Sequence, residues 1–345
     1  MPRKRFLVAG SLGLCVLFYT IKQADLRLLV TNIKEIHLFW GPLVILTSAL
    51  SYACIAAVLH RLLRSMGHTI PFASSFRISL VSCTLNYVMT IGGLSGIAAK
   101  VYLLAKEKIP PSNTLSISMV HGFLTNTVAV IFIYLGFFFL YSEYKLSARE
   151  KEAGIFILLI AFLLSWITIQ TIIHESFRKK LWQLCLWAVT FLCRKLHRPH
   201  WLKEERAQSF FANFNNSLNE ITRNSSILLA PAMYALLDWT LMFLCLKCSF
   251  LAIRYPVDNM TLLVGFSIGI FLNLFSLTPA SVGLMEGSMA GCFYLMGLDY
   301  NRALLATLLY RVAYYYLPIL ISLFYYKQLF VSTPPDMELV EEQKV

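Results

Sequence analysis

The sequence has few charged residues and no long polar segment. Only 14% of its 345 residues are Asp, Glu, Lys or Arg, whereas a soluble domain has roughly 25%. Apolar residues make up 58%, and they form repeated runs of about 20 residues that a bilayer can accommodate and a soluble core cannot. We therefore expect a single transmembrane domain over residues 1–331, no second folded domain, and a disordered acidic tail over residues 332–345.

The sequence also lacks the residue patterns of metal, redox and nucleic-acid chemistry. It contains no Asp-x-Asp pair, and Cys245 and Cys248 have no second pair of Cys or His at zinc spacing. Its eight cysteines lie mostly in apolar runs, which argues against an extracellular disulfide framework. The net charge of +12 comes mainly from loops beside apolar runs, where basic residues favour the cytoplasm and attract anionic lipid. We expect no cofactor, no metal and no nucleic-acid partner.

The apolar runs predict an all-α polytopic membrane protein with about six full spans. The predicted spans are residues 6–21, 39–60, 112–141, 153–173, 226–252 and 303–327. Arg3, Lys4 and Arg5 precede the first, which is expected to be a retained signal-anchor helix with a cytoplasmic N-terminus. Loop 174–225 has nine basic and four acidic residues, so it is expected in the cytoplasm, with an interfacial helix at 181–193. The C-terminus then returns to the cytoplasm of a multi-pass protein of the cell (inner) membrane.

Two more apolar segments, 74–105 and 260–297, are each interrupted near the middle. The first break contains Asn86, Gly92, Gly93 and Gly96, and the second contains Asn273, Thr278, Pro279, Ser281 and Gly283. In both, an Asn precedes a Gly by ten residues, and the two Asn are 187 residues apart. Backbone broken within hydrocarbon is tolerated only where protein or a water-filled cavity satisfies its polar groups. Each segment is therefore expected to be a re-entrant helical hairpin at a substrate site.

These hairpins divide the chain into two units, residues 39–141 and 226–327, each consisting of a span, a hairpin and a span. Loop charges place the start of one unit outside the membrane and the start of the other inside, which predicts inverted repeats. Inverted repeats with broken helices are the architecture of many alternating-access transporters. The alternative is that each interrupted segment crosses the membrane fully and is merely kinked, with its small residues serving helix packing.

Charged residues within the spans are the strongest candidates for a site, because such residues are rare at membrane depth. Arg311 lies inside the last span, and its planar guanidinium suits a phosphate or a carboxylate. Glu286 follows the second break and is expected to pair with Arg311, either around a substrate or as a structural ion pair. Asp238 lies mid-span, where it either joins that pair or carries a proton, and Lys100 follows the first break. His121, alone among apolar neighbours, is expected to be a satisfied core residue.

The breaks themselves offer a second kind of anion site. The N-terminus of a half-helix has unpaired N–H groups and a partial positive charge that favour an anionic group. The glycines of the first break permit close approach of the backbone, whereas Pro279 removes a donor and stops a helix. Thr278 and Ser281 are expected to cap the freed backbone groups.

Two blocks in the second unit resemble a known family. Residues 278–287, Thr-Pro-Ala-Ser-Val-Gly-Leu-Met-Glu-Gly, resemble the signature Thr-Pro-Gly-Gly-x-Gly-x-x-Glu-Gly of the lysylphosphatidylglycerol synthase transmembrane family. This family is also described as the flippase domain of bacterial multiple peptide resistance factors. Residues 309–318 resemble its next block, a Tyr-Arg pair followed by aromatic residues and Leu-Pro. The resemblance places Arg311, Glu286 and Tyr314 among the expected substrate-binding residues.

The first unit matches this family less closely. Residues 92–104 resemble a block in which Gly-Gly and an acidic residue precede Arg and Tyr-Leu-Leu. Lys100 stands in place of the Arg, and neither Ile97 nor Ala98 supplies the acid. In the second unit, Ala280-Ser281 replaces the Gly-Gly of the signature.

The broken segments, the buried charges and the resemblance together predict a lipid translocator, similar to a flippase, that moves an anionic or phosphate-bearing lipid between membrane leaflets. The alternatives are a membrane-embedded transferase acting on a polyprenyl-linked lipid or a phospholipid, and a small-solute secondary transporter. The aminoacyl-transferase domain of larger family members is not among these 345 residues, so we expect a transporter rather than an enzyme. A separate lipid-modifying enzyme and a homo-oligomer are further partners that the sequence leaves open.

Overall fold

The computed structural model describes residues 37–89, 94–144, 147–195, 204–223, 225–274, 278 and 281–330. The regular elements within these ranges are all helical, so the prediction of an all-α protein is confirmed. Four predicted features lie outside the described residues: the signal-anchor helix, Gly92 with Gly93, Pro279, and the acidic tail.

Within the described residues, five helical segments are long and apolar enough to cross a membrane. They are α3 (Trp40–Ser65), α6 (Pro111–Glu143), α7 (Ala148–Ile173), α10 (Ser225–Ala252), and a continuous last segment made of α13 (Tyr300–Arg311), the π-helical turn η3 (Val312–Tyr316) and α14 (Leu317–Phe330). At about 1.5 Å per residue, the 26 residues of α3 exceed a hydrocarbon core of about 30 Å. The five segments overlap five predicted spans, which confirms a polytopic membrane protein, while the total number of spans stays a prediction.

The two interrupted segments form pairs of shorter helices. α4 (Phe72–Val88) is followed by α5 (Leu94–Lys106), and α11 (Asn259–Leu274) is followed by α12 (Leu284–Leu295). α11 and α12 run antiparallel, because Gly265 lies against Phe293 while Gly269, one turn later, lies against Met289. With 17 residues in α4 and 12 in α12, these helices fall short of the about 20 residues that a full span needs.

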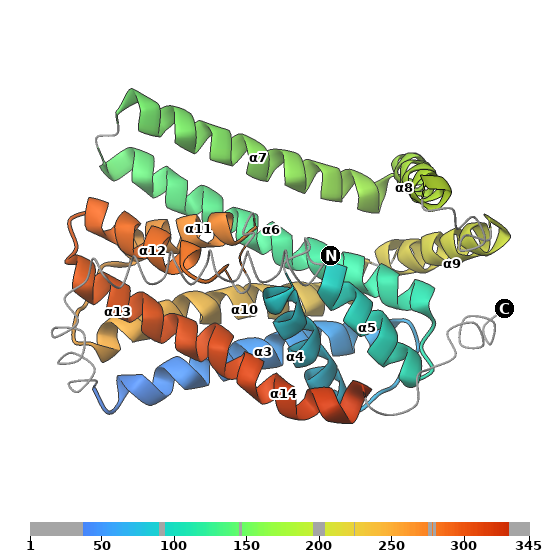
Figure 1. Cartoon of the computed structure of the whole chain (residues 1–345), viewed down its shortest axis with the longest axis horizontal. Coiled ribbons are helices and arrows are strands. Elements are labelled where there is room, and N and C mark those ends of the chain that lie inside the picture. The colour runs from blue at the N-terminus through green and yellow to red at the C-terminus, as the bar shows by residue number, and fades with distance from the viewer. Residues whose placement is uncertain are drawn as a thin grey trace.

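The two hairpins lie toward opposite ends of a bundle of long helices (Figure 1). In that view α11 and α12 lie to the left, whereas α4 and α5 lie nearer the right end. The helix order α3, α4, α5, α6 recurs as α10, α11, α12, α13. Ser51 of α3 bonds to Asp238 of α10 across 187 residues of sequence, which is also the spacing of Asn86 and Asn273. These observations agree with two equivalent units, while their inversion and the re-entry of the hairpins into a membrane stay predictions.

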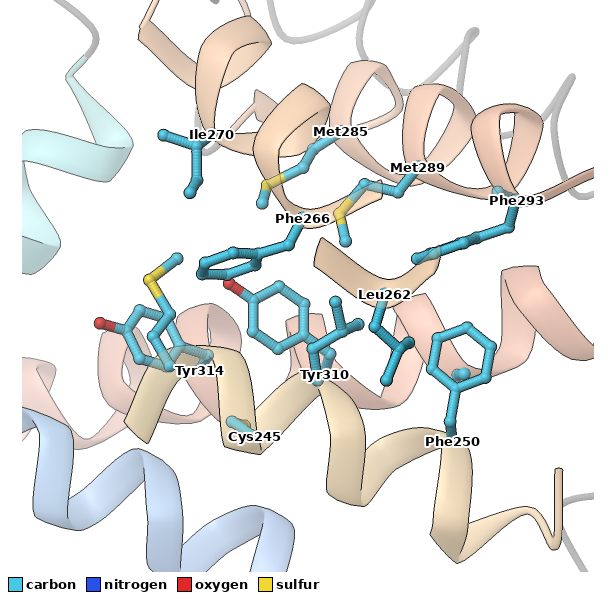
Figure 2. Close-up of a cluster of buried hydrophobic side chains, with 14 of the residues drawn as sticks. Cys245, Phe250, Leu262, Phe266, Ile270, Met285, Met289, Phe293, Tyr310 and Tyr314 are labelled. Carbon is cyan, nitrogen blue, oxygen red and sulfur yellow. The ribbon is translucent and has the colours of Figure 1, made fainter. Parts of the chain in front are cut away.

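The second hairpin packs against α10 and α13 through a filled apolar cluster. Figure 2 shows Phe266 of α11 and Met285 of α12 lying close to Tyr310 of α13. Phe293 contacts Phe250 of α10, with 5.1 Å between the ring centroids. All five side chains are fully buried. Between helices in a bilayer, such packing replaces the hydrophobic effect as the main source of association, so it fixes the hairpin on α13.

The predicted loop 174–225 is mostly helical, which corrects the sequence interpretation. It contains α8 (Glu175–Lys195) and α9 (Glu204–Arg223), and the predicted interfacial helix 181–193 is only the middle of α8. Lys, Arg and Glu favour a helix about as well as Leu does, so an apolar run underestimates helix length. Arg178 ties the two helices together, because its side chain is buried and donates to Asn215 at 2.8 Å and to Asn219 at 2.6 Å.

Gly136→Ala is expected to destabilise the protein, because the contact of α6 with α11 leaves no room for a side chain. A Cβ atom at Gly136 would lie 2.6 Å from Ser267 Cβ and 2.9 Å from the backbone oxygen of Leu263. Overpacking of this kind costs about 1–3 kcal/mol. Gly291→Ala in α12 is the control, since a Cβ there meets nothing within 4 Å and alanine favours a helix by about 0.5–1 kcal/mol. Thermal melting in detergent should show a lower melting temperature for Gly136→Ala alone, and equal values would contradict the tight contact.

Candidate functional site

Glu286 and Arg311 form a buried ion pair, as the sequence predicts. The Arg311 Nε donates a hydrogen bond to Glu286 Oε1 at 2.9 Å, and both side chains are fully buried. Glu286 lies in the first turn of α12, just after the second break, and Arg311 ends α13. Packing of α12 against α13 therefore brings the two charges together. A buried pair is stable only when its remaining donors and acceptors are also satisfied.

Glu286 has two further partners, which make its carboxylate part of the break itself. The Tyr316 hydroxyl donates to Oε1 at 2.7 Å, and the backbone N–H of Gly283 donates to Oε2 at 2.8 Å. Gly283 is the N-cap residue of α12 and has a φ of 81°, in the left-handed region that glycine adopts readily. Glu286 thus neutralises Arg311 and also satisfies a backbone N–H that the break leaves free.

Aromatic rings from the π-helical turn η3 enclose Arg311. Its guanidinium carbon lies 4.2 Å from the ring centroid of Tyr315 and 5.3 Å from that of Tyr316. Its Nη1 also lies 3.4 Å from the sulfur of Met285. A π-helical turn bonds residue i to i+5, so the fourth and fifth residues after Arg311 can both approach it. Tyr315 and Tyr316 were not identified from the sequence as partners of Arg311. The run of three tyrosines at residues 314–316 was the feature that could have suggested them.

Asp238 belongs to a second polar cluster and does not join the ion pair. Its Oδ1 accepts a hydrogen bond from Ser51 Oγ, which also lies 3.0 Å from the Tyr314 hydroxyl. Tyr52 donates to the backbone carbonyl of Tyr314 at 3.0 Å. All four side chains are buried, and Asp238 has no basic partner in the ranges that the structure describes. Of its two predicted roles, that of carrying a proton remains compatible with this geometry.

The asparagine of each break holds the start of the next half-helix. Asn86 Oδ1 accepts hydrogen bonds from the Gly96 N–H and the Ser95 hydroxyl, each at 3.0 Å. Asn273 Oδ1 accepts a hydrogen bond from the Ser281 hydroxyl. The Asn-to-Gly spacing corresponds to a direct contact only in the first break, because the Gly283 N–H of the second donates to Glu286 and Asn273 bonds to Ser281 instead.

The two predicted caps of the second break behave differently. Thr278 Oγ1 donates to the backbone carbonyl of Val282 at 3.2 Å, so it satisfies a freed backbone group as predicted. Ser281 does not cap the backbone, because its hydroxyl bonds to the Asn273 side chain. Its φ of 54° is uncommon for a residue with a side chain, and this left-handed turn directs Ser281 toward α11.

Lys100 lies on α5 and is separate from the ion pair of α12 and α13. The described site residues therefore fall into three places: the second break, the Asp238 and Tyr314 cluster, and the first hairpin with Asn86, Gly96 and Lys100. The second break contains Glu286 with Arg311, Gly283, Asn273, Thr278 and Ser281. No group of three or more His, Cys, Asp or Glu that could hold a metal ion occurs in the part of the chain that the structure describes.

Comparison with known proteins supports the resemblance seen in the motifs. The family profile described as Lysylphosphatidylglycerol synthase TM region matches residues 6–322, which is most of the chain. A curated relative, the UPF0104 membrane protein of Methanothermobacter thermautotrophicus (strain Delta H), is 22% identical over 250 residues. That alignment covers 68% of each of the two chains. The profile match includes the residues of the ion pair only as part of a longer agreement, so it identifies a family and not a role for Arg311.

Removing one partner of the ion pair is expected to destabilise the protein more than removing both. Glu286→Leu leaves the buried Arg311 charge uncompensated, which costs about 3–5 kcal/mol. Combining it with Arg311→Met places two apolar side chains together and should regain much of that loss. Melting temperatures of the wild type, the two single variants and the double variant form a double-mutant cycle. A double variant that melts as low as the summed single effects would show that the two residues are not coupled.

Proposed function

The chain belongs to the lysylphosphatidylglycerol synthase transmembrane family, and on this basis we propose that it translocates an anionic or phosphate-bearing lipid between the leaflets of the cell membrane. Membership of the family supports a membrane function connected with lipids. The ion pair at the second break supports the more specific step, which is recognition of an anionic headgroup.

A single observation carries the proposal: the permanently charged Arg311 is buried within a segment long and apolar enough to cross a membrane, and its carboxylate partner Glu286 also caps a helix break. A headgroup phosphate can take the place of Glu286, because its oxygens suit the same planar donors of the guanidinium. A neutral or cationic group cannot, since it would leave a buried charge uncompensated. When Glu286 is displaced, the N–H of Gly283 loses its acceptor and becomes a second donor for the headgroup. Headgroup binding and a change at the break are therefore linked.

The route across the membrane follows from treating the hairpins as re-entrant and the two units as inverted repeats. The breaks then meet near the middle of the bilayer, with Asn86, Gly96, Asn273 and Gly283 beside the path of the headgroup. The acyl chains stay in the surrounding lipid throughout. Two observations support this arrangement: the hairpins lie toward opposite ends of the bundle (Figure 1), and their helices are too short to span singly.

The proposed orientation puts both termini, α8 and α9 in the cytoplasm and the connection between α6 and α7 outside. Ser147→Cys is expected to react with a membrane-impermeant maleimide added to intact cells, whereas Ala212→Cys on α9 should react only after the membrane is opened. Both positions are exposed in the structure. A background in which the exposed Cys185 is replaced by Ser removes a competing thiol on α8. Equal labelling of both positions in intact cells would contradict the orientation.

Arg311→Lys is expected to slow lipid movement by about ten-fold or more, because lysine keeps the charge but loses the planar fork; a ten-fold loss corresponds to about 1.4 kcal/mol. The assay reconstitutes each variant in vesicles and follows a fluorescent phosphatidylglycerol that becomes accessible to a quencher added outside.

Glu286→Gln should also slow lipid movement in this assay, because Arg311 then holds the headgroup without a competing carboxylate.

Arg302→Lys is the matched control, since Arg302 lies on the same helix as Arg311 but is exposed. It should move lipid at the wild-type rate. An Arg311→Lys variant that folds normally and also moves lipid at that rate would make the arginine structural and remove the headgroup step. Transport of a soluble phosphate ester, with no lipid movement by the wild type, would favour the small-solute transporter instead.

A further inference from the structure

Five buried polar groups in the first unit have no hydrogen-bond partner among the residues that the structure describes. They are the hydroxyls of Ser79, Ser82, Thr114 and Ser118 and the Nδ1 atom of His121. Each of these side chains is at most 5% exposed. A buried polar group without a partner costs about 1–3 kcal/mol, so a group of them indicates an unseen ligand, ion or water. The sequence prediction that His121 is a satisfied core residue is therefore wrong for its Nδ1.

The five groups form one row on each of two helices. The two serines of α4 are three residues apart, and the three groups of α6 are four and then three residues apart, so each set shares a helix face. Other hydroxyls of these helices bond to the preceding turn: Thr84 donates to the carbonyl of Leu80 at 2.9 Å, and Ser116 to that of Ser112 at 3.0 Å. The unpartnered hydroxyls do not make this bond, so their protons remain available to a ligand.

Lys100 lies on α5, the helix that packs against both α4 and α6. Gly96 packs against α4, since a Cβ atom added there would lie 2.7 Å from the backbone oxygen of Ser82. Lys100 is one turn beyond Gly96 on a helix that folds back along α4, which brings it to about the level of Ser79. On its other side, α5 packs against α6, the helix that carries His121.

The Lys100 ammonium differs from the Arg311 guanidinium because it is not paired with a carboxylate among the described residues. In the part of the chain that the structure describes, it makes no ion pair and no hydrogen bond. Residues 72–106 contain no Asp or Glu, Glu107 directly after α5 is exposed, and the acid of α6, Glu143, lies at the far end of that helix. The nearest buried acid in the bundle, Asp238, is already bonded to Ser51. What this region lacks is therefore an anion.

We propose that Lys100, His121 and the unpartnered hydroxyls of α4 and α6 form a second anion site, which binds the phosphate group of the lipid. Its part in transport rests on the proposed function, whereas its ability to bind phosphate does not. A phosphate group offers more acceptor oxygens than a carboxylate does, and the site presents an ammonium and several hydroxyls as donors. The first hairpin lies toward the opposite end of the bundle from the second hairpin, whose helix α12 carries Glu286 (Figure 1), so the headgroup would meet Lys100 and Arg311 in turn.

The site is tested by lipid binding to the purified full-length protein in detergent. The probe is dioctanoyl phosphatidic acid, dioctanoylglycerol is the phosphate-free control, and binding is followed as a ligand-dependent rise in melting temperature. Measurements use the wild type and the double variant Glu286→Leu, Arg311→Met, in which the ion pair cannot contribute. Lys100→Met should weaken binding by at least about ten-fold in both backgrounds, the effect of losing one charge-assisted hydrogen bond.

Lys106→Met is the matched control, because Lys106 lies on the same helix with its Nζ 4.9 Å from the ring centroid of Tyr102, and it should bind as the wild type does. Ser82→Ala and Ser118→Ala test the site without altering its charge. They should leave the unliganded melting temperature unchanged or higher, since each removes an unpartnered group, and they should weaken binding. If Lys100→Met, Ser82→Ala and Ser118→Ala all bind the lipid as the wild type does, the site is overturned, and water is the partner of the hydroxyls.

Two further arms separate the ligand source and the two proposals. Displacement of the lipid by inorganic phosphate would show that the free anion suffices, and binding without such displacement would identify the lipid headgroup as the ligand; either result supports the site. If the wild type moves no lipid in vesicles, and Lys100→Met binds phosphatidic acid more weakly than the wild type does, the second site is supported and the translocator is contradicted. If lipid movement depends on Arg311, while Lys100→Met binds phosphatidic acid and moves lipid as the wild type does, the second site is contradicted and the translocator is supported.

Discussion

Within a bilayer, a broken helix must have its freed polar groups satisfied by the protein, and at the second break this depends on Glu286. Its two oxygens accept hydrogen bonds from Arg311, Tyr316 and the backbone of Gly283. One carboxylate therefore starts α12, neutralises a charge on α13 and orders the π-helical turn that follows it. Loss of that acceptor would affect all three at once, so in the proposed mechanism an anion that binds Arg311 also changes the backbone at the break.

The two units use a similar side-chain contact at their helix breaks but differ in how their charged groups are paired. In each, an asparagine accepts a hydrogen bond from residues further along the hairpin: Asn86 from Gly96 and Ser95 in the first turn of α5, and Asn273 from Ser281 within the break before α12. The second unit adds a carboxylate and a guanidinium that satisfy each other. In the first unit, the Lys100 ammonium and several hydroxyls make no hydrogen bond or ion pair with any of the described residues. This asymmetry is what a path needs if a phosphate is to leave one cation for another, because two equally satisfied sites would offer it no place to bind.

The membrane-spanning helices and their breaks could be predicted from the sequence, because they depend on the composition of a single stretch of chain. A run of about 20 apolar residues has one solution in a bilayer, so five spans agree with the structure, and Gly or Pro within such a run marks a break. The Glu286–Arg311 contact was also predictable, because an unpaired charge at that depth is costly and few partners exist. The charged ends of α8 and the whole of α9 were not, since charged residues belong to helices as readily as to loops and hydropathy does not separate the two.

The sequence by itself determined that this is a polytopic helical membrane protein, where its helices break, and which charges must be accounted for within it. Each of these follows from composition over one turn or one span. Only the tertiary structure decided which partner each polar group obtained: Tyr316 with Glu286, Ser51 with Asp238, and none within the described residues for Lys100. Those partners lie on other helices, and the packing of one helix on another depends on the shapes of side chains far apart in the chain, which hydropathy and spacing do not encode.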